Sequence, residues 1–384
     1  MPAFTEIAVD PPLADSYRTL LRAGGGDCIA PAPSSEKIIS GGSAPDVMER
    51  DLPTIDLKRL TSGSARERKA CADAMARAAS EWGFFQLTNH GVGRELMEEM
   101  RREQARLFRL PFETKEKAGL LNGSYRWGNP TATSLRHLSW SEAFHVPLAT
   151  ISQEDCDFGD LTSLSCLYMD DSTVAAALNG SCLACRGVMQ EVAGAMSRVA
   201  NTVAAVLAAK LTNTGHGGAG ARAAAWSFPA GCDETTCFLR LNRYPACPFA
   251  ADTFGLVPHT DSDFLTVLCQ DQVGGLHLMK DSRWVAVRPR PDTLIVNIGD
   301  LFQAWSNNRY KSVEHKVVAN AKTDRLSVAY FLCPSFDSFV GTCGEPSPYR
   351  AFTFGEYRKK VQEDVKTTGK KIGLPNFLKH SSVQ

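Results

Sequence analysis

The segment that most constrains the interpretation of this chain is LVPHTDSDFLTVLCQDQVGGLHL, residues 256–278. It has the texture of strands, and it places His259 and Asp261 two residues apart. Side chains at positions i and i+2 of a strand point to the same side of a sheet. The segment can therefore present an imidazole and a carboxylate side by side, and both groups are metal ligands.

A third ligand is offered by His315, in the strand-like run YKSVEHKVV that could lie beside the first segment in a barrel. Two histidines and one carboxylate occupy one face of an octahedron and leave positions for substrate and oxygen, as in non-haem Fe(II) oxygenases. Zinc with an open position is the rival metal. We interpret the remaining histidines as structural, namely His90, His137, His145, His216, His277 and His380.

An arginine ten residues after His315 favours the iron interpretation. In DRLSVAYFL, period two puts four side chains on one strand face: Arg325, Ser327, Ala329 and Phe331. A guanidinium that points inward requires an anion, and beside a metal it suits the far carboxylate of a small diacid. A zinc hydrolase has no use for such a group. Asn242 and Tyr244, in LRLNRYPACP, share a face and could add hydrogen bonds to the same acid, although ordinary strand polarity would also explain them.

The surrounding pattern predicts an α+β protein. Residues 1–50 are rich in Pro, Gly, Ala and Ser and are expected to lie loosely on the surface. Residues 51–211 read as mostly helical, with helices over 65–80, 94–110 and 171–211 and a strand at 82–91. Residues 212–235 are a Gly/Ala-rich loop, residues 236–345 alternate short β runs with turns as in eight-stranded double-sheet barrels, and residues 346–384 are a C-terminal helix and a frayed polar tail.

Composition argues for small molecules as partners. Basic and acidic residues number 42 each, so no global field attracts nucleic acid or an anionic membrane surface. We find no secretory h-region and no apolar run near the roughly 20 residues of a membrane span. The 12 cysteines are then reduced core residues, and the expected location is the cytoplasm, with the nucleus as a second compartment.

These motifs together resemble the plant 2-oxoglutarate and Fe(II)-dependent dioxygenases. The resemblance covers H-x-D at 259–261, the distal His315, R-x-S at 325–327 and N-x-Y-P-x-C-P at 242–248, with LPTIDL and WGFFQLTNHGV upstream. It implies a double-stranded β-helix, a cupin-like jelly roll wrapped by N-terminal helices. It also implies residue roles. His259, Asp261 and His315 would hold Fe(II), Arg325, Ser327 and Tyr244 would hold 2-oxoglutarate with help from Asn242, and Phe331 would line the substrate pocket. Ascorbate is the expected reductant.

Within that family, SYRWGNPTATS (124–134) and LSWSEAFHVPL (138–148) look like the gibberellin 2-oxidases that act on twenty-carbon gibberellins. A gibberellin 20-oxidase would carry Leu-Pro-Trp-Lys-Glu-Thr where this chain has Leu-Ser-Trp-Ser-Glu-Ala. The resemblance implies that O2 and 2-oxoglutarate serve to hydroxylate C2, which yields succinate and CO2 and inactivates the hormone or its precursors.

Candidate contacts to that diterpenoid acid are Tyr125, Trp127 and Trp140 as flat apolar surfaces and Arg126 as a carboxylate partner, with Lys311 as a second basic candidate. The tryptophans could equally be core residues, and Lys311 a solvated surface residue. Three alternatives to the gibberellin reaction stay open: a flavonoid or other terpenoid hydroxylase, a zinc hydrolase, and a non-catalytic jelly-roll binding protein. The oligomeric state is also open.

Overall fold

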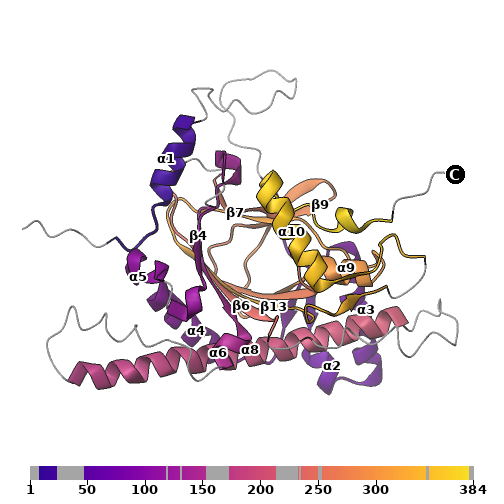
Figure 1. Ribbon diagram of the computed structural model, residues 1–384. Coiled ribbons are helices and arrows are strands. Elements are labelled where there is room, and N and C mark those ends of the chain that lie inside the picture. The colour runs from indigo at the N-terminus through magenta and orange to yellow at the C-terminus, as the bar shows by residue number, and fades with distance from the viewer. Residues whose placement is uncertain are drawn as a thin grey trace, which may run out of the picture.

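The computed structural model describes residues 8–23, 47–117, 120–129, 132–152, 173–212, 232, 235–249, 253–342 and 346–379. Within these ranges the chain forms two β-sheets that face each other, with helices on the outer side of the larger sheet (Figure 1). This is the double-sheet barrel that the strand pattern predicts. The site described below lies between the two sheets.

The larger sheet has eight strands, and all its pairings are antiparallel except the one between β2 and β3. In spatial order the strands are β2 (Thr54–Asp56), β3 (Phe84–Thr88), β11 (Leu294–Ile298), β8 (Leu265–Gln270), β13 (Arg325–Leu332), β6 (Phe238–Tyr244), β5 (Glu142–Pro147) and β4 (Tyr125–Trp127). Four of these strands come from residues 51–211. That region is therefore not a separate helical unit, because it completes the sheet on which the later residues build the site.

The smaller sheet has five strands, in the order β1 (Glu49–Arg50), β10 (Arg283–Val287), β9 (Leu276–Lys280), β12 (His315–Val318) and β7 (Phe254–His259). Strands β12 and β7 are antiparallel, and their register pairs His315 directly with His259. The prediction that these two runs are neighbours is thus confirmed. A third, two-stranded antiparallel sheet is formed by β14 (Phe339–Val340) and β15 (Phe352–Thr353).

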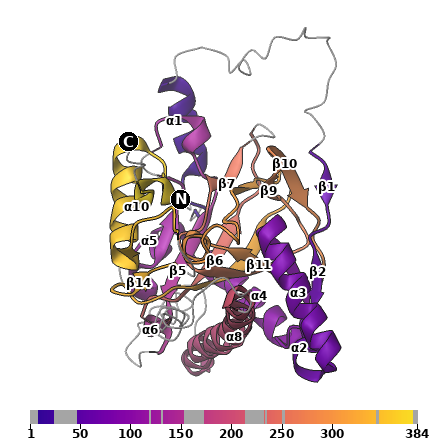
Figure 2. The ribbon, with the colours of Figure 1, turned by 90° about the vertical axis from the view of Figure 1, so that its right-hand side faces the viewer.

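Helices cover the outer face of the larger sheet, as Figure 2 shows for α3, α4 and α8. The α-helices are α1 (Leu13–Ala23), α2 (Lys58–Ser62), α3 (Ala65–Glu81), α4 (Arg94–Phe108), α5 (Phe112–Glu116), α6 (Leu148–Ser152), α8 (Thr173–Thr212), α9 (Asp300–Trp305) and α10 (Phe354–Thr368). Short 3-10 turns are η1 (Leu120–Gly123), η2 (Leu135–His137) and η3 (Leu374–Phe377). Capping boxes start α3 at Ser64 and α10 at Thr353, which satisfies N–H groups that a helix end leaves unpaired.

One part of helix α8, Cys185–Leu211, is apolar and long enough to match a membrane span by length and composition. The expectation that no apolar run approaches this length therefore needs correction. The segment's buried residues, among them Met189, Met196 and Val203, belong to the main hydrophobic core. Packing against β8 and β13 accounts for the apolar composition of this segment.

Both ends of the chain differ from expectation. Residues 1–50 do not all lie loosely, because α1 packs Leu13 (2% exposed) and Tyr17 against Trp140. The C-terminal residues beyond α10 are not frayed up to position 379, since Leu374 and Phe377 are buried. Spaced apolar residues in otherwise polar segments carry this packing. The predicted loop over 212–235 lies almost entirely outside the described residues.

Candidate active site

Three donor groups converge between the two sheets. The Nε2 atoms of His259 and His315 lie 3.6 and 3.7 Å from Oδ1 of Asp261, and the ligand atoms of the three residues are all within 4.8 Å of one another. His259 ends β7 and His315 begins β12, whereas Asp261 lies two residues beyond the end of β7. The expectation that the H-x-D pair shares a strand is wrong in that detail, yet both side chains face the same space.

The outer atoms of these side chains are fixed by hydrogen bonds. The Nδ1 atoms of His259 and His315 lie 2.8 and 3.1 Å from the carbonyl oxygens of Val257 and Val313. A proton on Nδ1 satisfies each carbonyl and leaves the Nε2 lone pair free for a metal. Both strands belong to the smaller sheet, where adjacent backbone holds the two rings at this orientation.

The carboxylate of Asp261 is held in the same way. Its Oδ2 atom accepts hydrogen bonds from the Thr266 hydroxyl (2.6 Å) and from the Asn297 amide (2.7 Å), so that Oδ1 faces the two imidazoles. Thr266 and Asn297 were not identified from the sequence. The signal available there was a polar residue in the middle of each of two apolar strands, β8 and β11, because a buried polar group needs a partner.

Electrostatics keep Asp261 and His315 in the states that a metal ion requires. Burial alone would raise the pKa of Asp261, but the two neighbouring imidazoles and the Thr266 hydroxyl outweigh it and hold that pKa well below its usual range. Burial, with the neighbouring His259 ring, lowers the pKa of His315 to about 4. The cluster is thus a carboxylate with an adjacent neutral imidazole. Such nitrogen and oxygen donors suit Fe(II).

A buried arginine lies in the same cavity. Arg325 is 2% exposed; its guanidinium donates to Oε1 of Gln270 (2.8 Å) and weakly to the Ser327 hydroxyl (3.4 Å), and lies 4.9 Å from the centre of the Tyr244 ring. Its Nε atom has no partner, and no carboxylate among the described residues forms an ion pair with it. The Asn242 amide contacts Ser327 Oγ at 3.4 Å. These donors together form an anion-binding site.

Metal donors and arginine line one cavity of about 430 Å³. Its wall draws on both sheets and includes Phe331, Ala329, Ser327 and Arg325, so the period-two prediction for β13 is confirmed. The opposite face of that strand, with Val328 and Tyr330, packs into the core. The alternation is what directs polar groups inward in an otherwise apolar strand.

Most of the residues predicted to bind substrate lie elsewhere. Tyr125 donates to the buried Glu142 carboxylate (2.5 Å), and Trp127 packs on Phe112. Trp140 is 4% exposed and packs against Tyr17 and Phe249, so the core interpretation of the tryptophans holds for it. These residues, with the exposed Arg126 and Lys311, do not line the cavity. Aromatic composition alone could not distinguish a pocket wall from a core.

His145 shows the opposite error. We interpreted it as structural, but it lies in the cavity wall, stacked on Phe238 at 3.9 Å, and Phe238 stacks on Phe331 at 4.3 Å. Burial first, and then the charges of Arg240 and Arg358, lower the pKa of His145 to about 4. It therefore acts as a neutral ring. Its place on β5 gave no sequence signal, because β5 is far from the metal motif in the chain.

Similarity to known proteins agrees with this geometry. Residues 235–334 match the 2OG-Fe(II) oxygenase superfamily, and residues 52–156 match the family of the non-haem dioxygenase in morphine synthesis N-terminal region. The chain is 81% identical to gibberellin 2-beta-dioxygenase 6 of Oryza sativa subsp. japonica, with 100% of both chains covered. The chain belongs to the gibberellin 2-beta-dioxygenase family.

A second relative in this gibberellin 2-beta-dioxygenase family is gibberellin 2-beta-dioxygenase 8 of Arabidopsis thaliana, 49% identical over 87% of this chain and 89% of that one. Among solved structures, JOX2 in complex with 2OG, Fe and JA is 27% identical with a TM-score of 0.64, covering 88% of this chain and 92% of that one. The protein is thus an Fe(II)- and 2-oxoglutarate-dependent dioxygenase with the jelly-roll fold that the family resemblance implied.

Proposed function

We propose that this dioxygenase hydroxylates C2 of twenty-carbon gibberellins on the β face, and that the reaction inactivates the hormone precursors. The 2-beta-dioxygenase activity is supported by the similarity to the rice protein across the full length of both chains. The preference for twenty-carbon substrates is supported by the segments at 124–134 and 138–148, which resemble those of gibberellin 2-oxidases that act on twenty-carbon gibberellins. Residues 138–143 differ from the pattern of the 20-oxidases, which argues against 20-oxidation.

In this proposal His259, Asp261 and His315 hold Fe(II), while Arg325, Ser327 and Tyr244 hold the distal carboxylate of 2-oxoglutarate with help from Asn242. The observation that carries it is the buried, carboxylate-free Arg325 in the same cavity as a two-histidine, one-aspartate cluster. A diacid that reaches from the metal to the guanidinium would satisfy both. A zinc hydrolase would leave Arg325 without a function.

Bound Fe(II) and 2-oxoglutarate supply the oxidising chemistry, in which O2 is consumed, 2-oxoglutarate becomes succinate and CO2, and one oxygen atom enters the substrate C–H bond. The protein's residues bind and orient. Asn297 and Thr266 fix the carboxylate of Asp261, and the aromatic wall of Phe238 and Phe331 excludes water from the reacting carbon. No side chain is needed as an acid or a base.

The test is an incubation of the purified protein with Fe(II), ascorbate, 2-oxoglutarate and an equimolar mixture of twenty- and nineteen-carbon gibberellins, followed by mass spectrometry. We expect a product with one added oxygen at C2 from the twenty-carbon pool, with an equal amount of succinate. Turnover confined to the nineteen-carbon pool would contradict the subgroup. Succinate formation without turnover of either gibberellin pool would contradict the substrate but not the site. A fluorescent fusion would test the expected cytoplasmic location.

A further inference from the structure

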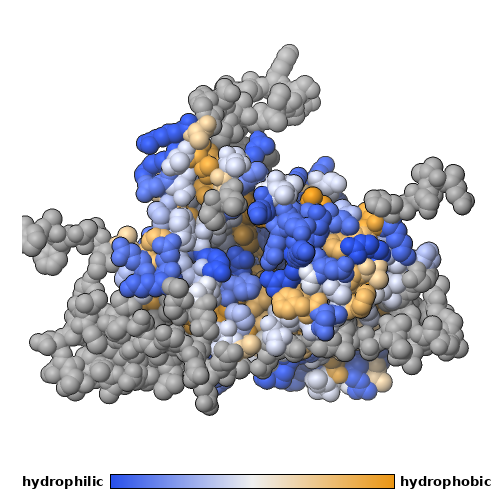
Figure 3. Space-filling view, viewed as in Figure 1, coloured by the Kyte–Doolittle hydropathy of each residue, from blue (hydrophilic) through white to orange (hydrophobic). Residues whose placement is uncertain are grey.

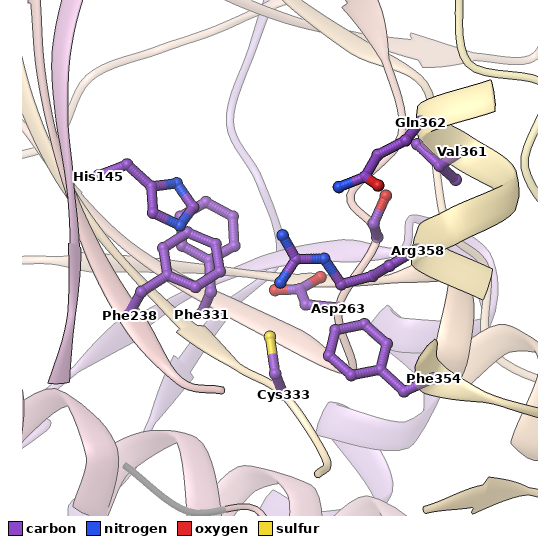
Figure 4. Close-up of a pocket in the computed structure, with 10 residues that line it drawn as sticks. His145, Phe238, Asp263, Phe331, Cys333, Phe354, Arg358, Val361 and Gln362 are labelled. Atoms are coloured by element: carbon purple, nitrogen blue, oxygen red, sulfur yellow. The ribbon is translucent and has the colours of Figure 1, made fainter. Parts of the chain in front are cut away.

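A second space of about 220 Å³ lies next to the metal cavity, beside helix α10. The two spaces adjoin, because His145, Phe238, Ser262, Phe331 and Val361 contribute to the walls of both. Figure 4 shows this outer pocket, with the strand residues on one side and residues of α10 on the other. A substrate that reaches the metal from this side must pass along that wall.

One wall of the outer pocket is flat and apolar. His145, Phe238 and Phe331 form a continuous stack, with interplanar angles of 19° and 10° between successive rings. Two stacked phenylalanines and an uncharged imidazole offer a broad surface for a fused-ring hydrocarbon skeleton. The stack carries no formal charge, so a charge on the ligand has to be balanced from the other side of the pocket.

The other wall supplies a cation. Arg358 extends from α10 into the pocket towards the aromatic stack (Figure 4). Its guanidinium lies near the rings of Phe336 (5.3 Å) and Phe354 (5.9 Å). Within the part of the chain that the structure describes, Arg358 forms no ion pair with a carboxylate. The buried carboxyl of Asp263 also lines the pocket, and its Oδ2 atom lies 2.8 Å from the oxygen of the Thr266 hydroxyl.

The other basic candidates are less suited. Arg240 also lines the cavity, but it donates to Oδ1 of Asn242 at 2.8 Å and is thereby directed towards the 2-oxoglutarate end. Lys371 forms an ion pair with Asp300 at 2.9 Å. The positions expected from the sequence, Arg126 and Lys311, are exposed and lie outside the cavity. Among these basic residues, Arg358 combines a place in the pocket wall with a guanidinium that forms no ion pair with a carboxylate of the described residues.

We infer that Arg358 binds a carboxylate of the gibberellin while the His145–Phe238–Phe331 stack packs against its ring skeleton. This rests on the proposed function and adds the residue that sets substrate orientation. A guanidinium at one end and a flat wall along the side fix two directions of a rigid molecule, which is what selects one carbon for oxidation. Arg358 is thus a specificity residue for acidic fused-ring substrates.

The experiment compares wild type with Arg358→Ala, Arg358→Lys and Lys359→Ala, the last as a matched loss of one exposed charge on the same helix. Each enzyme is assayed with a gibberellin and with its methyl ester. For the acid, Arg358→Ala should raise KM about 10- to 100-fold, the loss of one charge-assisted contact. The methyl ester should show no such rise. Arg358→Lys should recover most of the loss, and Lys359→Ala and all values of KM for 2-oxoglutarate should match wild type.

Binding is measured in parallel by calorimetry on the anaerobic enzyme loaded with Fe(II) and 2-oxoglutarate, which needs no turnover. Two results would overturn the inference and leave the proposed function intact. In one, the enzyme hydroxylates the gibberellin but its affinity for the acid does not depend on Arg358. In the other, Arg358→Ala weakens binding of the acid and of the methyl ester equally. Arg358-dependent binding of the acid without hydroxylation would support the inference and refute the proposed function. Absence of both binding and turnover would overturn both.

Discussion

Two arginines on opposite faces of the larger sheet have opposite surroundings. Arg243, on β6, contacts three carboxylates, those of Asp10, Glu142 and Asp324, at 2.6 to 2.7 Å. Arg325, on the neighbouring β13, is more deeply buried and has no ion pair with a carboxylate among the described residues. The first belongs to a buried network that also includes Lys115 at 2.6 Å from Glu142.

The difference separates structure from function. A buried charge is costly unless it is paired, so a network with complete partners needs nothing further and serves the fold. An unpaired buried cation is retained only where a ligand supplies the missing charge, and perturbed or unsatisfied groups cluster at functional sites. The cavity face of the sheet carries such groups, whereas the outer face at Arg243 does not. Four changes test this contrast.

The largest effect is expected at the metal donors. Asp261→Ala leaves two histidines, which hold Fe(II) poorly, and removes the carboxylate whose charge the imidazoles face. We expect turnover to fall to background, as measured by succinate release, together with loss of Fe(II) on gel filtration. An unchanged melting temperature would show that the fold survives. Wild-type turnover in this variant would refute the metal centre.

Arg325→Ala should weaken 2-oxoglutarate binding by about 2–5 kcal/mol, the cost of removing one partner of a buried charge pair. Calorimetry with the metal-loaded enzyme measures this directly. Because the variant also removes an unpaired buried charge from the ligand-free protein, urea unfolding without 2-oxoglutarate should show no loss of stability. An unchanged affinity for 2-oxoglutarate would refute the assignment of Arg325 as the partner of its distal carboxylate.

Arg243→Ala should show the reverse pattern. Removal of Arg243 takes one of two cationic partners from the fully buried Glu142, which should lower the free energy of unfolding by about 3 kcal/mol. The loss stays at this lower end of the usual range because Lys115 remains as a partner. The affinity for 2-oxoglutarate should stay at the wild-type value. If this variant instead lost 2-oxoglutarate binding while keeping its stability, the contrast between the two faces would collapse.

The smallest effect concerns pH. The pKa of His145 is lowered from 6.5 to about 4, so the unfolded chain takes up a proton below pH 6.5 that the folded chain refuses until about pH 4. Stability should therefore fall as the pH is lowered through that window. His145→Phe should make this fall less steep. In the metal-free protein part of the pH dependence should remain, because the pKa values of His277 and His315 are also lowered to about 4. An unaltered slope would contradict the buried, neutral state of His145.

The sequence was sufficient for the parts of the site that local periodicity controls. The H-x-D pair, the distal histidine and the inward face of β13 follow from alternation along single strands, and the structure brings these side chains into one cavity. Strand positions and the long helix α8 followed from the same reasoning. That the strands of His259 and His315 could be neighbours was also expected, whereas the register that pairs the two histidines was not.

What the sequence could not supply depends on which distant segments meet. Trp140, just before β5, and Tyr125, on β4, have the chemistry of a pocket wall, yet both are buried outside the cavity, whereas His145 on β5 lines it. Asn297 and Arg358 reach the site from strands or helices without a recognisable motif. The sequence shows which side chains share a face of a strand or helix, but the tertiary fold decides what that face packs against.

Helix α10 also bears on how such an enzyme can change. Its cavity side is a single stripe, Phe354, Arg358, Val361 and Val365, spaced at three and four residues. The metal and 2-oxoglutarate residues all precede it in the chain. Substitutions along this one stripe can reshape the outer pocket and leave the oxidising centre untouched. The substrate range of such an enzyme can thus change through substitutions on one face of α10, while the strands that carry the metal donors and Arg325 stay the same.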